Sequence, residues 1–262
     1  MDITLIRTLV LFVAIGLTGC ASKPEAVAET PSVNNDAAYV DGRDPLESIN
    51  RPIWDFNYDI LDKFVLRPAT VGYMAVVPKP ARKGLVHAAD NLSEPASFVN
   101  SVLQAKPSSA AISAGRFLVN STLGVFGLFD VATHIGLVER QEDFGQTLAV
   151  WGVGDGAYLM LPAMGPNTVR DTTGRVVDNL YFPLALLNTP ASIVRSAIGA
   201  LDAREQAMSM ENLLEESLDP YAFVKEAYYQ RLDFKIYDGN PPKPDEPEVD
   251  EAALDDLLDD LD

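Results

Sequence analysis

Apolar positions recur at three- and four-residue steps along most of this chain, which is the spacing of amphipathic helices. Asp44 is placed to cap the first of them, Pro45 suits its first turn, and Pro52 is expected to bend it. Its apolar positions are Ile49, Ile53, Phe56, Ile60, Leu61 and Phe64. Further helices are predicted over residues 81–92, 93–104, 107–122, 169–180, 192–210 and 220–234. The short apolar run 157–161, closed by Pro162, predicts a strand, so the fold class is mainly α with little β.

Two segments, 100–130 and 145–165, are richer in apolar residues than surface helices usually are. Neither contains the run of about 18 apolar residues that a membrane-spanning helix needs. They suit either the core of a globular helical domain or helices that lie within one membrane leaflet. The N-terminal anchor described next favours the second explanation.

The N-terminus has the pattern of a secretory signal that ends on a cysteine. Arg7 precedes an apolar run over residues 9–17, and the small residues Thr18 and Gly19 lead to Cys20, the only cysteine of the chain. This pattern predicts cleavage before Cys20 and attachment of lipid to its thiol and new amino group, rather than an ordinary signal peptide with a chance cysteine. Ala21, in place of an aspartate, is typical of export to the outer membrane.

Charge is concentrated at the C-terminus. The net charge is −18, and residues 241–262 carry ten acidic residues against one lysine, which is half of that total. Such a balance argues against nucleic-acid binding and against simple electrostatic docking on anionic headgroups. The tail also has one apolar stripe, formed by Leu254, Leu257, Leu258 and Leu261. It suits either a helix that docks into a partner's groove or a solvated acidic end.

The predicted organisation therefore has four parts. Residues 1–19 are a signal peptide, and residues 20–43 are the lipidated cysteine with a flexible tether. Residues 44–238 form the helical domain, and residues 239–262 form a proline-rich linker with the acidic tail.

Signatures of catalysis are largely missing from the sequence. The two histidines, His87 and His134, have no partner at metal-ligand spacing, and neither a G-x-S-x-G motif nor a phosphate-binding loop occurs. We therefore expect no enzyme activity, no metal and no cofactor apart from the covalent lipid on Cys20. Gly152, Gly154 and Gly156 allow unusual backbone angles, which suits either a tight turn before the strand or a hinge.

A series of short motifs in a fixed order resembles the MlaA (VacJ) family of outer-membrane lipoproteins. The resemblance covers residues 44–234 and is more specific than any one motif. The motifs are Asp44-Pro45-Leu46-Glu47, Asn50-Arg51, Val77-Pro78-Lys79-Pro80-Ala81-Arg82, Asn91-Leu92-Ser93-Glu94-Pro95, Arg116-Phe117-Leu118-Val119-Asn120-Ser121, Phe144-Gly145-Gln146-Thr147-Leu148, Asp219-Pro220-Tyr221 and Tyr228-Tyr229-Gln230-Arg231.

This resemblance implies a ring-like bundle of amphipathic helices in the inner leaflet of the outer membrane, on its periplasmic side, around an amphipathic channel. It implies removal of stray phospholipids from the outer leaflet and their transfer to a periplasmic lipid carrier, often beside a trimeric porin. The alternative is a structural lipoprotein that scaffolds porins, and a hydrolase is the third candidate. Only the transport function requires a polar path through the protein.

Four polar residues of otherwise apolar helices are candidates for the lining of that channel: Arg116, Asn120, Arg170 and Asp171. A buried headgroup needs polar partners, although the same residues would equally suit buried pairs that hold helices together. We further expect Gly152, Gly154 and Gly156 to form a flexible channel rim, and the leucine stripe of the tail to dock on the carrier.

Overall fold

A computed structural model describes residues 42–242. The chain divides into two units, Met1–Tyr39 and Val40–Asp262, and the first lies outside the described residues. The helices of the described part are α2 (Glu47–Asp55), α3 (Arg67–Val76), α4 (Lys79–Asn91), α5 (Glu94–Leu103), α6 (Pro107–Thr122), α7 (Val131–His134), α8 (Phe144–Val150), α9 (Val169–Asp178), α10 (Thr189–Ala207), α11 (Glu211–Glu215) and α12 (Pro220–Ile236). A π-helix, η1 (Phe56–Leu66), joins α2 to α3, and two 3₁₀ turns, η2 (Leu184–Leu186) and η3 (Met208–Met210), flank α10. The predicted mainly helical fold class is confirmed.

The strand predicted over 157–161 is present as β1 (Tyr158–Leu161). It pairs antiparallel with β2 (Gly165–Thr168), and the register places Tyr158 opposite Thr168. The second strand was not predicted, because its sequence Gly-Pro-Asn-Thr has neither alternating apolar residues nor strong β-formers.

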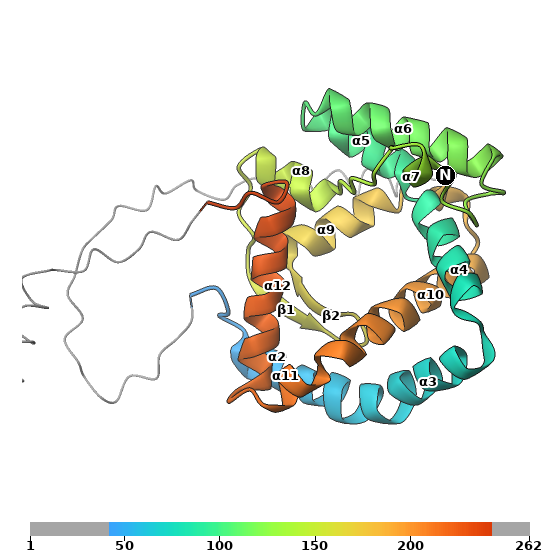
Figure 1. Cartoon of the computed structure of the whole chain (residues 1–262). Helices are drawn as coiled ribbons and strands as arrows, with labels where there is room; N and C mark the ends of the chain where they lie inside the picture. The colour runs from blue at the N-terminus through green and yellow to red at the C-terminus, as the bar shows by residue number, and fades with distance from the viewer. Residues whose placement is uncertain (1–41, 243–262) are drawn as a thin grey trace, which may run out of the picture. The chain divides into compact units, whose positions relative to one another are not determined.

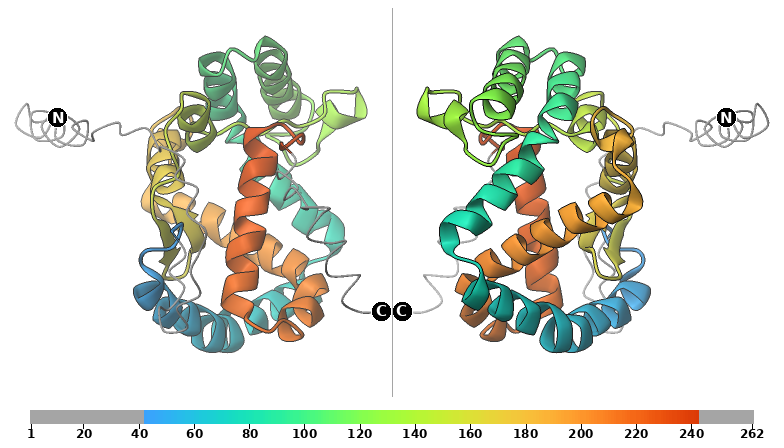
Figure 2. Two further views of the ribbon diagram at one scale, coloured as in Figure 1. Left: turned by 90° about the vertical axis from the view of Figure 1, so that its left-hand side faces the viewer. Right: turned by 90° about the vertical axis from the view of Figure 1, so that its right-hand side faces the viewer.

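Within the described part, the helices follow one another around a central space (Figures 1 and 2). The continuous run α2–η1–α3 forms one arc, α4 turns away from it, and α5 and α6 pack as an antiparallel pair. Helix α10 crosses this arrangement and packs on α3 and α4, while α12 packs on α8 and β2. Thus segments from both halves of the sequence enclose the centre, in agreement with the expected ring.

Helices α8 and α9 approach each other unusually closely, and glycine makes this possible. A Cβ atom on Gly174 would lie only 2.4 Å from the backbone nitrogen of Gly145. A side chain at Gly174 would require movement of a helix, and one at Gly145 would displace the Asp171 carboxylate, whose oxygen would lie 2.8 Å from the new Cβ. This contact fixes α9 as one wall of the central space.

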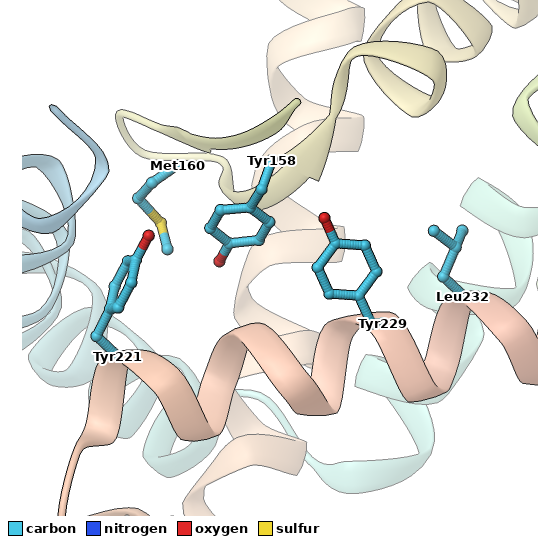
Figure 3. Packing of buried hydrophobic residues seen from close by; sticks show 5 residues of the cluster. All are labelled: Tyr158, Met160, Tyr221, Tyr229 and Leu232. Carbon is cyan, nitrogen blue, oxygen red and sulfur yellow. The ribbon is translucent and has the colours of Figure 1, made fainter. Parts of the chain in front are cut away.

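The apolar core is small and lies between the hairpin and α12 (Figure 3). It consists of Tyr158, Met160, Tyr221, Tyr229 and Leu232. The rings of Tyr158 and Tyr221 meet edge to face with their centroids 6.2 Å apart, a favoured aromatic geometry. This cluster attaches the C-terminal helix to the hairpin.

Asp44 does not cap the first helix, contrary to the prediction. The helix begins at Glu47, and the buried carboxylate of Asp44 accepts hydrogen bonds from the Asn50 side chain (2.8 Å) and from the Tyr221 hydroxyl. Its other neighbour is Lys225, at 3.4 Å. The residue therefore ties the start of the domain to α12, a long-range contact that local sequence does not reveal.

In the described part, polar residues are buried more often than apolar ones, the reverse of the pattern in a soluble protein. Nine apolar residues are buried, whereas twenty-one polar or charged residues are buried. Large apolar side chains are instead exposed over much of the surface, for example Phe64 (70%), Val76 (81%) and Phe126 (81%). Soluble monomers rarely expose apolar surface on this scale, so the exterior suits an apolar environment. Across residues 42–242, no helix combines the length and apolar character needed to cross a bilayer.

Candidate functional site

A cavity of about 700 Å³ lies inside the arrangement of helices. Its walls come from the C-terminal end of α4, the N-terminal end of α5, the segment 139–143, the β-hairpin, α9, α10 and the end of α12. These elements are distant in sequence, so only the assembled domain forms the cavity. Its size falls within the usual range for a small-molecule site.

Six carboxylates line this cavity, and most of them are engaged by neighbouring groups. Glu94 and Glu142 are held by cations: Arg116 lies 2.5 Å from Glu94, and Lys106 lies 3.0 Å from Glu142. Asp143 is held by Lys235 at 2.9 Å. These three carboxylates therefore contribute little net charge to the cavity.

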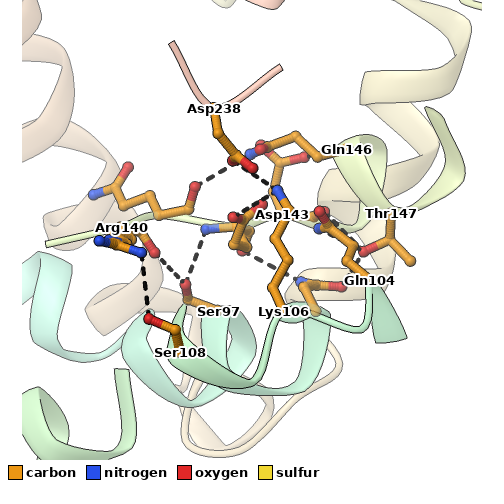
Figure 4. A network of polar contacts seen from close by, with 12 residues as sticks. Ser97, Gln104, Lys106, Ser108, Arg140, Asp143, Gln146, Thr147 and Asp238 are labelled. Carbon is orange, nitrogen blue, oxygen red and sulfur yellow. Dashed lines mark hydrogen bonds and ion pairs between the residues drawn. The ribbon is translucent and has the colours of Figure 1, made fainter. Parts of the chain in front are cut away.

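Figure 4 shows the polar network behind this wall. The Lys106 ammonium also binds Asp238, at 2.7 Å, and so connects α6 to the end of α12. Burial lowers the pKa of Lys106, but the hydrogen bonds to Asp238 and Glu142 outweigh it, and the net pKa is raised. The side chains of Gln104 and Thr147 join the network through a hydrogen bond of 3.1 Å. The network thus connects the ends of α5, α6 and α12 with α8.

Two arginines of the lining have no acidic partner in the part of the chain that the structure describes. Arg175 lies on α9, and Arg195 lies on α10. The guanidinium of Arg195 donates to the Ser93 hydroxyl at 2.6 Å and to the backbone carbonyl of Ala89 at 3.4 Å. Burial lowers the pKa of Arg195. Because a guanidinium binds phosphate through parallel N–H donors, these two side chains equip the cavity for an anion.

One cavity carboxylate, Asp90, also lacks a hydrogen-bond partner for its side chain among the described residues. Burial is the main cause that raises the pKa of Asp90 to about 6, followed by the charge of Glu139, while Arg195 opposes the shift. The cavity therefore offers both an unpaired anion and unpaired cations.

A second cavity, of about 610 Å³, continues along the same two helices. On α10, Ser196 lines the first cavity and Arg204 lines the second. On α12, Lys235 lines the first cavity and Ala227 lines the second. Each pair is separated by about 12 Å of helix at 1.5 Å per residue. The wall from α11 and α12 is largely apolar, with Leu214, Phe223, Val224 and Ala227. A polar compartment is thus followed by a more apolar one.

Both arginines of the second cavity are paired with acidic residues. Arg204 binds Asp62 at 2.6 Å and Glu211 at 2.5 Å, and Arg67 also reaches Glu211, at 3.3 Å. The hydrogen bond from Arg204 is the main cause that lowers the pKa of Glu211. These contacts hold η1, α3, α10 and α11 together and leave no unpaired arginine at this cavity within residues 42–242.

Arg116 and Asn120, two of the predicted channel residues, lie in a different place. Arg116 is 3% exposed on α6 and binds Glu94 on α5, as well as the Thr133 hydroxyl at 2.9 Å. Asn120 donates to Asp130 at 3.1 Å and accepts from the backbone N–H of Ala132. Neither residue lines the cavities described above. Their contacts are those of the alternative considered from the sequence, buried pairs that hold helices together, and a channel role for them stays a prediction.

Arg170 and Asp171 are also held by protein partners. Arg170 pairs with Asp155 at 2.5 Å and donates to the carbonyl of Val153 at 3.1 Å. Asp171 accepts a hydrogen bond of 2.6 Å from Tyr228, which contributes after burial to a raised pKa of that tyrosine. Arg170 therefore attaches the glycine-rich segment to α9, a connection between two predicted sites that the sequence did not reveal.

The three glycines of that segment differ in their surroundings. Gly152 has a φ of +86°, and a Cβ there would meet open space. A Cβ on Gly154 would also be unhindered, whereas one on Gly156, with a φ of +70°, would lie 3.0 Å from Val169. None of them lines either cavity. Their role as a channel rim stays a prediction, as does the role of Cys20 and of the leucine stripe in the tail, which lie outside the described residues.

The residues that sequence reasoning missed are Asp90, Arg175, Arg195 and Lys235. For Arg195 a signal was present, because it is the only charged residue in the stretch 189–201. The other three look like ordinary surface charges in the sequence, and only the fold brings them to the cavity. Residues 42–242 hold no group of three or more His, Cys, Asp or Glu side chains arranged for a metal ion.

An apolar exterior around a cavity lined mainly by polar and charged residues is typical of a helical protein that associates with a membrane. Comparison with known proteins is more specific. The family model of the MlaA lipoprotein matches residues 42–235. The chain is 38% identical over 257 residues to the intermembrane phospholipid transport system lipoprotein MlaA of Haemophilus influenzae, covering 96% of each chain. It is 41% identical over 219 residues to the protein of the same description from Escherichia coli K12, covering 82% of this chain and 87% of the relative.

A solved structure, from work on the structural basis for maintenance of bacterial outer membrane lipid asymmetry, is also similar. It superimposes with a TM-score of 0.70 at 42% identity, over 74% of this chain and 98% of the other. The chain belongs to the MlaA lipoprotein family, a family of transport lipoproteins. The resemblance inferred from the sequence motifs is thereby confirmed.

Proposed function

We propose that this protein removes phospholipids from the outer leaflet of the outer membrane and passes them, through the cavity inside its helices, toward a lipid carrier in the periplasm. The observation that carries the proposal is the polar cavity with two unpaired arginines inside a domain whose exterior is apolar. The relatives described as intermembrane phospholipid transport lipoproteins support it.

The physical problem of such transport is the headgroup. Moving a phosphate through hydrocarbon without partners is very costly, whereas acyl chains cross it freely. Arg175 and Arg195 would bind the phosphate inside the first cavity. The apolar wall of the second cavity and the exposed apolar side chains of the exterior would accompany the acyl chains.

The expected location follows from the same reasoning. We infer that lipid on Cys20 directs the protein to the outer membrane, and that the domain then lies on the periplasmic side with its exposed apolar side chains in the inner leaflet. A Cys20→Ala variant should remain as precursor at the inner membrane. Recovery of that variant in the outer membrane at the normal level would contradict this view of the anchor.

The proposed partners are a trimeric porin and a soluble periplasmic lipid carrier. The tail, with Leu254, Leu257, Leu258 and Leu261 on a proline-stiffened linker, suits docking on the carrier. Truncation after Pro244 should weaken carrier binding, measured with purified components. Unaltered binding would leave the tail as a solvated acidic end.

A structural lipoprotein that scaffolds porins is the alternative function. Such a protein needs no internal space and no unpaired cations inside its fold. A partly buried arginine without an acidic partner destabilises a domain, so a scaffold would gain stability from an apolar residue in place of Arg195. The cavity therefore favours transport.

The test uses a strain without this protein, complemented with variants of the full chain. Ser196→Trp places a large side chain in the first cavity, whereas Ala197→Trp, on the next position of α10, does not line it. We expect the wild-type protein and Ala197→Trp to restore low surface phospholipid and detergent resistance, and Ser196→Trp to fail at equal protein level. Full complementation by Ser196→Trp would refute transport through this cavity.

A further inference from the structure

The charges of the first cavity, taken one by one, leave a single acidic group without a partner. Glu94, Glu142 and Asp143 are each paired with a cation, as described above. The carboxylate of Asp178 accepts hydrogen bonds from the Asn100 side chain at 2.7 Å and from a backbone N–H at 3.0 Å. Glu139 accepts from Gln141 at 2.7 Å and lies 3.9 Å from an arginine. Only Asp90 remains.

The position of Asp90 relative to Arg195 is defined by hydrogen bonds on both sides. Arg195 donates to the carbonyl of Ala89, which precedes Asp90, and to the hydroxyl of Ser93, three residues beyond it. The guanidinium therefore lies over the end of α4, close enough to Asp90 for the two charges to attract each other, although they form no ion pair. The cavity presents a carboxylate and a guanidinium side by side, each available to a ligand.

Two adjacent, opposite charges match a headgroup that itself carries two opposite charges. In phosphoethanolamine, two carbon atoms separate an anionic phosphodiester from an ammonium group with three N–H donors. A phosphate on Arg195 would bring such an ammonium to Asp90. Phosphatidylglycerol has no cation to offer the carboxylate, and its own charge would be repelled by it. Phosphatidylcholine has the cation but no N–H donor, so it cannot form the charge-assisted hydrogen bond.

We propose that this cavity discriminates among phospholipids in favour of those with a primary ammonium in the headgroup, and that Asp90 is the residue responsible. The inference rests on the proposed function, because it assumes that a phospholipid headgroup occupies the cavity. It goes beyond that function by assigning a headgroup class and the group that recognises it.

The test measures which lipids the intact protein retains. Full-length lipidated protein is reconstituted in nanodiscs that contain equal amounts of phosphatidylethanolamine, phosphatidylcholine and phosphatidylglycerol with identical acyl chains. The protein is then transferred to detergent, and the lipids that stay bound to it are counted by native mass spectrometry. We expect about fivefold enrichment of phosphatidylethanolamine over each of the other two, which corresponds to about 1 kcal/mol.

Asp90→Asn should reduce this enrichment to about twofold or less, while the total amount of bound lipid stays similar. The matched control is Asp233→Asn, which removes the same charge from an exposed position of α12 that does not line the cavity. It should keep the preference of the wild-type protein. Asp90→Glu, which restores the carboxylate, should recover part of the preference.

The outcomes distinguish failure of the headgroup preference from failure of the transport function. Lipids retained in equal proportions by the wild-type protein, or a preference that survives in Asp90→Asn, would overturn the inference while leaving transport intact. Retention of no phospholipid of any class would instead contradict the proposed function, and the inference would fall with it.

Discussion

The buried pair of Arg116 and Glu94 allows a direct test of whether the polar residues of α6 hold the domain together or line a path. Both side chains are 4% exposed, and their N–O distance is 2.5 Å. Burial raises the pKa of Glu94, and Arg116 opposes this shift. In Arg116→Ala the carboxylate would remain buried without its cation, and the hydrogen bonds to the Thr133 hydroxyl and the Leu137 carbonyl would also be lost.

Breaking a buried pair in this way typically costs about 3 to 5 kcal/mol, so we expect Arg116→Ala to lose about that much unfolding free energy. The measurement is urea unfolding in mild detergent, followed by circular dichroism. Replacing both partners, as Arg116→Met with Glu94→Gln, should recover at least half of the loss, because no charge is then left unpaired. Arg140→Ala is the control, since this exposed arginine has only a 3.5 Å contact with Ser108 and its loss should cost less than about 0.5 kcal/mol.

Unfolding stability and lipid transport, measured on the same variant, together test whether Arg116 is a contact between helices. If Arg116→Ala unfolds at the wild-type urea concentration but fails to lower surface phospholipid in cells, Arg116 acts on the lipid path, as first predicted from the sequence, and not as a helix contact. If stability falls while correctly folded protein still transports at low temperature, the structural role holds.

Three further predictions concern other elements. Asp90→Asn should stabilise the protein at pH 7 by about 1 to 3 kcal/mol and have no effect near pH 4, because a carboxyl whose pKa is raised to about 6 in the folded protein lowers the free energy of unfolding as the pH rises from 4 to 6. Equal stabilisation at both pH values would contradict this. Tyr158→Phe should leave the melting temperature nearly unchanged, since its buried hydroxyl has no hydrogen-bond partner. Tyr228→Phe should cost about 1 to 3 kcal/mol of unfolding free energy, because the Asp171 carboxylate loses its hydrogen-bond donor, and a larger loss in Tyr158→Phe would show that these bonds are wrongly assigned. Gly154→Val should fold with wild-type stability, so any change in lipid flux would test the channel-rim hypothesis directly. Gly156→Val should lower the melting temperature, because the φ of +70° and the Val169 side chain 3.0 Å away oppose any side chain there.

Local sequence predicted the helices well where apolar spacing was regular. The helix predicted over 220–234 corresponds to α12, and the helix over 107–122 to α6. The π-helical segment Phe56–Leu66 was expected to be ordinary α-helix, because its apolar residues recur at similar steps in either geometry. The prediction that Asp44 caps the first helix was wrong, since its partner Tyr221 lies far along the chain.

The site was harder to predict than the fold. Arg116 stood out because it interrupts an apolar helix, but such a residue suits a buried ion pair as well as a channel, and sequence contains no information on what faces it. Asp90 and Arg175 looked like ordinary surface charges. They became cavity residues only because α4 and α9 are placed around the same space by α10 and by the glycine contact between α8 and α9.

The central claim is that phospholipid headgroups occupy the first cavity, and site-specific photocrosslinking in growing cells tests it most directly. A photoreactive amino acid is introduced at Ser196, inside the cavity, or at Phe126, an exposed apolar position of the exterior, and adducts with ³²P-labelled lipid are detected after illumination. We expect a labelled adduct at position 196. Labelling at position 126 without any at position 196 would show that the protein lies in the membrane but does not carry lipid through its interior.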